Sequence, residues 1–265
     1  MLTNFQHVLV VQDGAVLTVT MNRPEVLNAI NDLMLQELIE VVEAASHDTE
    51  VRCLVINGAG RGFGSGQDLT LFVDTDGHSA FPDVSEHLQP YHDLVNLIHY
   101  MPKPVIAAIH GVAAGISLNI ALACDLRIAA DNARFTEAFA RIGLVPDGGG
   151  AYFLPRLVGL AKALEMALLT DEVSAIEAER IGLINKCVPA ADIEHETHTL
   201  AQRLADGPTR TYGYIKDLFY SALDQNLSAV LEMEGQFQGA ALATEDHHEG
   251  VTAFLQKRRP KYTGQ

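Results

Sequence analysis

The feature that most constrains this fold is a long apolar stretch, VIAAIHGVAAGISLNIALACDL, which covers residues 105–126. It is long enough to span a bilayer, but two glycines and the polar residues His110, Ser117 and Asn119 interrupt it, and alanine is its commonest residue. A buried strand, a glycine turn and a buried helix explain the stretch better than a membrane span. We therefore expect a sheet covered by helices and no association with a membrane.

The N-terminal segments predict the start of such a sheet. The sequence HVLVVQDGAVLTVTMN indicates a β-hairpin, because two alternating apolar runs flank the turn pair Asp13-Gly14. The sequence INDLMLQELIEVVEAAS has the apolar spacing of a helix, with Asn31 or Asp32 as its N-cap.

Strands alternate with helices up to about Val188, which is typical of α/β layering, and only helices are predicted beyond Asp192. We therefore expect an α/β core of residues 1–191 and a C-terminal helical region of residues 192–265. The polar, Gly- and Pro-containing residues 73–85 are expected to form a mobile loop.

The composition of the chain limits the kinds of partner that it can bind. Eighteen Lys and Arg stand against 34 Asp and Glu, a net charge of −16, which opposes affinity for nucleic acid or anionic membrane. Cys53, Cys124 and Cys187 are an odd number without metal-binding spacing. We expect three buried free thiols in a reducing compartment, no metal site, no signal peptide and a cytoplasmic location.

Two glycine turns follow predicted buried strands. The segment RGFGSGQDL, residues 61–69, can aim main-chain N–H groups at an anion or a polarised oxygen, and it has neither P-loop nor dinucleotide spacing. Gly115 and Ile116 open a predicted helix, so their amides lie at its positive end. Two such turns on neighbouring strands would form an oxyanion hole. Close packing of a helix on a sheet is an equally valid explanation of the second turn.

Asp147 stands in GLVPDGGGAYFLP, residues 143–155. The Pro-Asp-Gly sequence is explained by a turn alone. Because Leu144, Val145 and residues 151–154 are apolar, we expect buried flanks that disfavour the ionised carboxylate and raise its pKa.

Taken together, these segments resemble the enoyl-CoA hydratase/isomerase, or crotonase, family. The resemblance is carried by VLTVTMNRPEVLNAI, GAGRGFGSGQDL, the apolar stretch with its flanks, GLVPDGGGAYFLPRLVG and EGVTAFLQKRRPKYTG, in that order. It implies a crotonase fold of repeated ββα units forming two sheets, with C-terminal helices that form trimers, often paired into hexamers. It also implies an acyl-CoA thioester as substrate and no separate cofactor.

The resemblance implies site residues by position. The two oxyanion amides fall on Gln67 and Ile116, and Lys257 of this or a neighbouring subunit would meet a phosphate of coenzyme A. The remaining coenzyme A contacts are expected at Val26, Phe63, Ser65, Gly66 and Asp68.

Two departures from the family pattern indicate the chemistry. Family hydratases hold water between two glutamates, and these positions are Asn119 and Phe139 here, which cannot act as acids or bases. Glu137 is two residues away from the second position. Family isomerases that lack both glutamates use an aspartate in the turn of Asp147, and the Leu-x-Pro-Asp-x-Gly-Gly pattern resembles those acting on ring-epoxide thioesters in phenylacetate breakdown.

The sequence thus predicts an acyl-CoA isomerase in which Asp147 shuttles a proton. Its substrate is expected to be a 3-enoyl-CoA or an aromatic epoxide thioester. Two alternatives stay open: an enoyl-CoA hydratase in which Glu137 or another group handles water, and a non-catalytic acyl-CoA- or RNA-binding scaffold, whose RNA-binding form the charge of −16 opposes.

Overall fold

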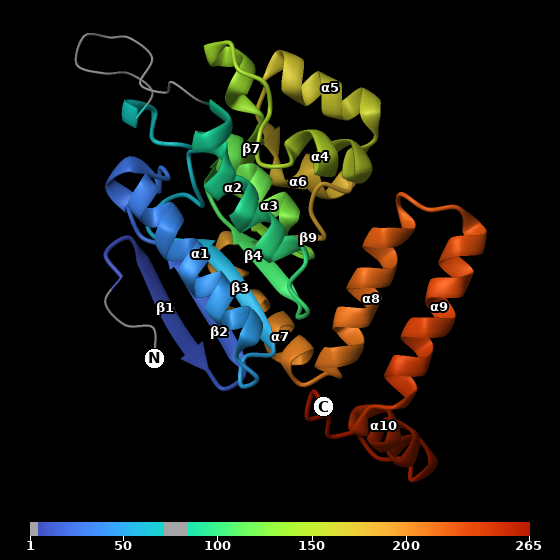
Figure 1. Ribbon diagram of the computed structural model, residues 1–265. Helices are drawn as coiled ribbons and strands as arrows, with labels where there is room; N and C mark the ends of the chain where they lie inside the picture. The colour runs from blue at the N-terminus through green and yellow to red at the C-terminus, as the bar shows by residue number, and fades with distance from the viewer. Residues whose placement is uncertain (1–4, 72–83) are drawn as a thin grey trace.

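Two sheets form the centre of the molecule. The computed structural model describes residues 5–71 and 84–265 (Figure 1). The large sheet has the order β1-β2-β3-β4-β6-β9, and the small sheet has the order β5-β7-β8. The strands of the large sheet are β1 (Val8–Asp13), β2 (Val16–Met21), β3 (Cys53–Gly58), β4 (Val105–Ile109), β6 (Leu126–Ala130) and β9 (Lys186–Val188). Those of the small sheet are β5 (Val112–Ala114), β7 (Arg134–Thr136) and β8 (Val173–Ser174).

The pairing confirms the predicted hairpin and the α/β layering. β1 and β2 are antiparallel, with Asp13 opposite Val16, whereas β2, β3, β4, β6 and β9 pair in parallel. Parallel neighbours need crossover connections, which here contain helices. The first six helices are α1 (Asp32–His47), α2 (Val84–His99), α3 (Gly115–Ala123), α4 (Gly150–Val158), α5 (Leu160–Leu169) and α6 (Ala175–Arg180). Asn31 is the N-cap of α1, since its side chain accepts the Met34 N–H at 2.9 Å.

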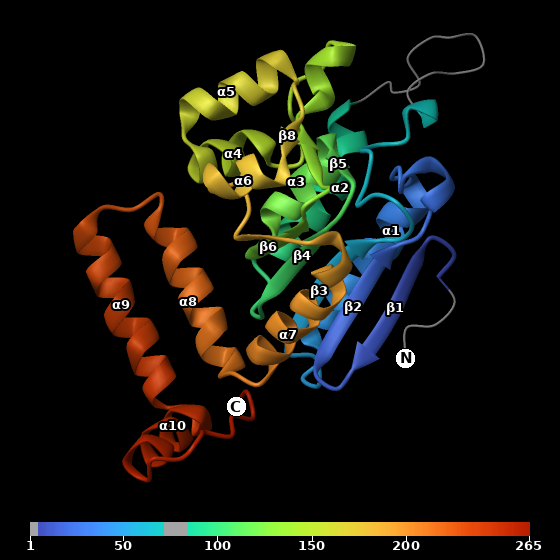
Figure 2. The ribbon, with the colours of Figure 1, turned by 180° about the vertical axis from the view of Figure 1, so that it is seen from behind.

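Successive side chains of a strand point to opposite faces of the large sheet, so each face has its own hydrophobic core. Leu54 and Ile56 of β3 belong to the main core beneath α1, α2 and α3, whereas Cys53 and Val55 belong to a smaller core on the opposite face. The helix α7 (Ile193–Ala205) covers that opposite face, as the reverse view shows (Figure 2).

The long apolar stretch forms the predicted buried strand β4 and buried helix α3, in which every residue is buried. It also forms the short strand β5, which was not predicted, and the first residue of β6. Within the described parts of the chain, no helix is long and apolar enough to cross a membrane. Of the three free thiols, Cys53 and Cys124 are buried, but Cys187 is half-exposed. The expectation of burial was wrong for Cys187 because β9 is the edge strand of the sheet.

The C-terminal region is helical, as predicted. The helices α8 (Thr209–Ala222), α9 (Leu227–Leu242) and α10 (Glu245–Leu255) extend away from the sheets, whereas α7 packs on them (Figure 1). The division into residues 1–191 and 192–265 remains a prediction. Residues 73–83 of the expected loop lie outside the described residues, and Val84 and Ser85 begin α2.

Candidate active site

The structure brings the two predicted glycine turns side by side. Gly64 forms a parallel bridge with Ala113, its N–H donates to Val112 O at 3.0 Å, and Ala114 N–H donates to Gly64 O at 2.9 Å. Further along the first turn, the Gly66 N–H donates to Ser117 Oγ at 3.1 Å. The turn after β3 is therefore hydrogen-bonded to the turn that opens α3.

Two glycines make this close approach feasible. Gly66 has φ of +104° and Gly115 has φ of +51°, in the left-handed region that side chains disfavour. A Cβ on Gly66 would lie 3.3 Å from Ala114 O, and a Cβ on Gly115 would lie 4.0 Å from the Gly66 Cα. The next residues, Gln67 and Ile116, thus present their amides from adjacent turns.

The Gln67 and Ile116 N–H groups have no acceptor within residues 5–71 and 84–265. Ile116 lies in the first turn of α3, where N–H groups lack intrahelical partners and the helix dipole is positive. Both amides are therefore available to a ligand oxygen.

The turn of Asp147 packs on the same helix. Asn119 Nδ2 donates to the Asp147 carbonyl oxygen at 2.8 Å. Gly148 has φ of +53°, and a Cβ there would collide with Ile116 Cδ1. A Cβ on Gly150 would in turn meet the Asn119 amide. These contacts hold Asp147 beside the first turn of α3.

Asp147 itself is half-buried, and its Oδ1 has no hydrogen-bond partner in the part of the chain that the structure describes. Burial raises its pKa to about 6, which confirms the predicted direction. The expected burial of the flanks was wrong in part, because Leu144 is 40% exposed, Val145 is 79% exposed and Ala151 is also exposed. The left-handed Gly143 ends the short helix η3 (Ala138–Ile142), and the following residues run along the outside.

A second carboxyl group, Glu137, lies beside Asp147. Its side chain is completely buried, and burial followed by the Asp147 charge raises its pKa to about 8. Phe139, at the position of the second family glutamate, is buried, and its ring packs on Gly115. The sequence pointed to Glu137 only as an acid two residues from the second glutamate position, and its full burial beside Asp147 is seen in the fold.

Helix α2 closes the site from another side. The His87 ring contacts the Gln67 side-chain amide. The Tyr91 hydroxyl is buried without a partner among the described residues, and its pKa is raised by burial and then by nearby carboxylates, Asp147 among them. Neither residue was predictable from the sequence, because nothing local connects α2 to this site. No cluster of three or more His, Cys, Asp or Glu side chains suited to a metal occurs in residues 5–71 and 84–265.

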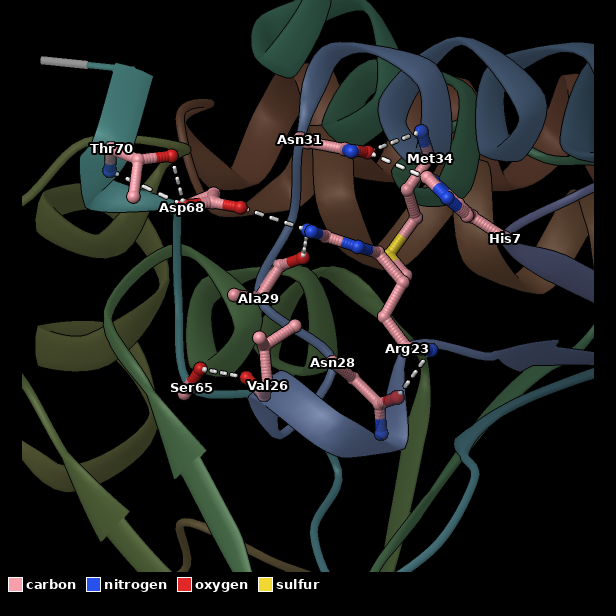
Figure 3. A network of polar contacts seen from close by, with 10 residues as sticks. All are labelled: His7, Arg23, Val26, Asn28, Ala29, Asn31, Met34, Ser65, Asp68 and Thr70. Carbon is pink, nitrogen blue, oxygen red and sulfur yellow. Dashed lines mark hydrogen bonds and ion pairs between the residues drawn. The ribbon is translucent and has the colours of Figure 1, made fainter.

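A polar network joins the glycine loop to the turn before α1 (Figure 3). Arg23 donates to Ala29 O at 2.6 Å and to Asp68 Oδ2 at 3.0 Å. Asp68 Oδ1 also accepts from the Thr70 hydroxyl at 2.7 Å, and this bond is the largest of the influences that lower the Asp68 pKa. Asp68, an expected contact of coenzyme A, therefore also holds the glycine loop in place through its own hydrogen bonds.

The same network places the other expected coenzyme A residues. Ser65 Oγ donates to Val26 O at 3.2 Å, and both side chains reach the surface (Figure 3). Phe63 differs, because its side chain is fully buried in the main core. Its N–H donates to His110 O and its carbonyl accepts from Asn28 Nδ2. Phe63 thus packs the core and presents no group to a ligand in this conformation.

Lys257 follows α10 and is exposed. The tail beyond it returns to the start of β3, where Arg52 donates to Tyr262 O at 3.0 Å. The glycine loop leaves the opposite end of β3, so α10, which Lys257 follows, lies apart from the loop of its own chain (Figure 1).

The fold agrees with the family comparison. A family model described as enoyl-CoA hydratase/isomerase matches residues 12–265. The chain belongs to the enoyl-CoA hydratase/isomerase family and is an enzyme of the crotonase superfamily.

Individual relatives include both kinds of activity. The chain is 43% identical over 247 residues to the "Probable enoyl-CoA hydratase" of Rhodobacter capsulatus, covering 93% of each. It is 42% identical over 254 residues to the 1,2-epoxyphenylacetyl-CoA isomerase of Escherichia coli, covering 95% of this chain and 96% of the relative. The solved enoyl-CoA hydratase from a Polaromonas species superimposes with a TM-score of 0.91 at 34% identity, covering 96% and 99%. Family membership alone therefore does not distinguish hydratase from isomerase.

Proposed function

We propose that this enzyme is an acyl-CoA isomerase in which Asp147 moves a proton between two carbons of a coenzyme A thioester. The observation that carries the proposal is the position of Asp147: its unpaired Oδ1 and raised pKa occur on a turn fixed to the helix that presents the Ile116 amide. In this proposal the Gln67 and Ile116 N–H groups hold the thioester oxygen.

The chemistry requires these parts and no metal or redox cofactor. Removal of an α-proton builds negative charge on the thioester oxygen, and one preorganised donor stabilises such charge by about 3 kcal/mol. A single base then returns the proton to another carbon. The role of Asp147 as the single base is supported by Asn119. Family hydratases have a glutamate at this position, whereas Asn119 donates a hydrogen bond to the turn of Asp147.

The substrate proposed is a 3-enoyl-CoA or an aromatic epoxide thioester. The Escherichia coli relative, named 1,2-epoxyphenylacetyl-CoA isomerase, favours the second. Val26, Ser65, Gly66 and Asp68 would line the path of coenzyme A, and Lys257 would reach a phosphate from a neighbouring subunit of a trimer or hexamer. Because all three thiols are free, a reducing, cytoplasmic location belongs to the same proposal.

An enoyl-CoA hydratase is the second candidate, favoured by one observation: two carboxyl groups, Glu137 and Asp147, interact in the site. Hydration needs both to reach one water molecule. Glu137 is 0% exposed, which opposes direct contact with a substrate water and makes this candidate the weaker one.

The test is a panel of 2-enoyl-, 3-enoyl- and aryl-epoxide-CoA thioesters with products identified by mass and by proton position. We expect a product of unchanged mass from a 3-enoyl or epoxide substrate and slow or no hydration of crotonyl-CoA. A product heavier by one water, formed as fast as the substrate disappears, would move the assignment to the hydratase.

A further inference from the structure

The buried carboxyl of Glu137 is the least explained polar group near the site. Neither Oε1 nor Oε2 has a hydrogen-bond partner within residues 5–71 and 84–265, and the neighbouring Asn119 Oδ1 also lacks one. Buried polar atoms are nearly always paired, because an unpaired one loses its hydration without compensation. Three unpaired oxygens on two interacting side chains therefore indicate a missing proton donor.

Asn119 connects this carboxyl to the proposed base. Its Nδ2 donates to the Asp147 carbonyl oxygen at 2.8 Å. The Asn119 side chain also lies close enough to Glu137 to act on that carboxyl as a hydrogen-bonding group, and the Asp147 charge acts on the same carboxyl. An ionised carboxylate only accepts hydrogen bonds, so it cannot serve the Asn119 oxygen. A protonated carboxyl adds the donor that the Asn119 oxygen lacks.

We propose that Glu137 is a positioning residue, kept as a neutral carboxylic acid whose O–H donates to Asn119 Oδ1, so that Asn119 holds Asp147 in its reactive position. The inference rests on the proposed role of Asp147 as the base. Glu137 does not touch the substrate, because its side chain is completely buried.

The surrounding charges favour this protonation state. Asp147 is the charged group that acts on Glu137, and the Tyr91 hydroxyl of α2 lies near Asp147. No cation among the described residues is an identified influence on either carboxyl. The pKa of Glu137 is about 8, raised by burial and then by Asp147, while a smaller influence of the Asn119 side chain lowers it. The pKa of Asp147 is about 6. Near pH 7 the two carboxyl groups therefore hold opposite protonation states.

The pH profile of kcat tests the inference. In the unaltered enzyme, kcat should rise as Asp147 ionises near pH 6 and fall as Glu137 ionises near pH 8. Glu137→Gln keeps a neutral donor of the same shape, so it should retain the acidic limb and lose the alkaline limb. Glu137→Leu removes the donor and should lower kcat on the order of tenfold with KM unchanged. An alkaline limb that persists in Glu137→Gln, or full turnover in Glu137→Leu, would overturn the inference.

Infrared difference spectroscopy supplies a readout that does not depend on turnover. The unaltered enzyme should show a carboxylic-acid carbonyl band at pH 7 that disappears in Glu137→Gln. In Asp147→Asn the band should titrate at lower pH, because the charge that raises the Glu137 pKa is gone. Absence of the band at pH 7 would overturn the inference. Normal turnover by Asp147→Asn would instead refute the proposed function, while the band would still report on Glu137.

Discussion

The burial of Asp147 favours catalysis but lowers the stability of the folded protein. A half-buried carboxylate with an unpaired oxygen is a stronger base than an exposed one, because burial disfavours its charge. The same burial makes the ionised group a cost to the folded state. The substitution Asp147→Asn tests both effects, one by turnover and the other by unfolding.

Asp147→Asn should retain the fold and the binding of coenzyme A but lower turnover by roughly 10² or more, since the amide cannot accept the substrate proton. Steady-state kinetics on the true substrate provide the measurement. Asp171→Asn, which changes an exposed acid in the loop after α5, is the matched control and should leave turnover unchanged. Near-normal turnover in Asp147→Asn would remove Asp147 from the mechanism.

The same variant should be more stable than the unaltered enzyme at pH 8. The folded pKa of Asp147 is about 6 against 3.8 for an exposed aspartate, so the folded state binds this proton more tightly than the unfolded state. Stability is therefore lost as pH rises through that window, by up to about 3 kcal/mol. Urea unfolding at pH 4 and pH 8 should show the advantage of the variant at pH 8 only. A variant less stable at pH 8 would contradict the burial argument.

At the scale of elements, glycines at positive φ allow the turns after β3 and β4 to approach each other. Gly111 has φ of +56°, and a Cβ there would lie 2.0 Å from the main-chain oxygen of Arg61. That overlap involves backbone on both sides, so no flexible side chain can move to relieve it. The position of the Gln67 amide relative to α3 thus depends on Gly111.

Gly111→Ala should therefore destabilise the fold by several kcal/mol and lower kcat, because the two turns must separate. Gly14→Ala is the matched control, since Gly14 has a similar φ of +58° but nothing within 4 Å of the added Cβ. The control should lose only about 1 kcal/mol, the conformational cost alone. Equal losses of unfolding free energy in the two variants would show that the contact with Arg61 is unimportant.

At the scale of the whole molecule, the C-terminal helices α8 and α9 expose several large apolar side chains, and such surfaces mark interaction sites. Leu227 and Leu231 of α9 and Phe219 of α8 are all more than half exposed. Every described residue of α9 is at least partly exposed. A helix of this composition is expected to pack against another copy of the chain.

The chain should form a trimer of about 86 kDa, three times 28.7 kDa, or a hexamer of twice that mass, through a symmetric interface. Light scattering measures the mass directly. The double variant Leu227→Glu with Leu231→Glu should dissociate the assembly, whereas Gln236→Glu on the same helix should not. A monomer of constant mass at all concentrations would contradict the prediction.

The sequence alone determined the N-terminal hairpin and the buried helix, because their signals are local. Alternation at period two predicted the hairpin of β1 and β2, and the glycine turn with its following apolar residues predicted α3 from Gly115 to Ala123. A turn aspartate with raised pKa was predictable as well, since the apolar residues 151–154 stand next to Asp147 in the chain.

Only the tertiary structure decided how the polar groups of the site meet. Three different elements supply the groups around Asp147: Glu137 is the N-cap of η3, Asn119 lies on α3 and Tyr91 lies on α2. Their proximity to the turn of Asp147 depends on how those elements pack. Burial and pairing are sums over neighbours from the whole chain, so no local pattern encodes them. For the same reason the exposure of Val145 and the full burial of Phe63 became visible only in the folded molecule.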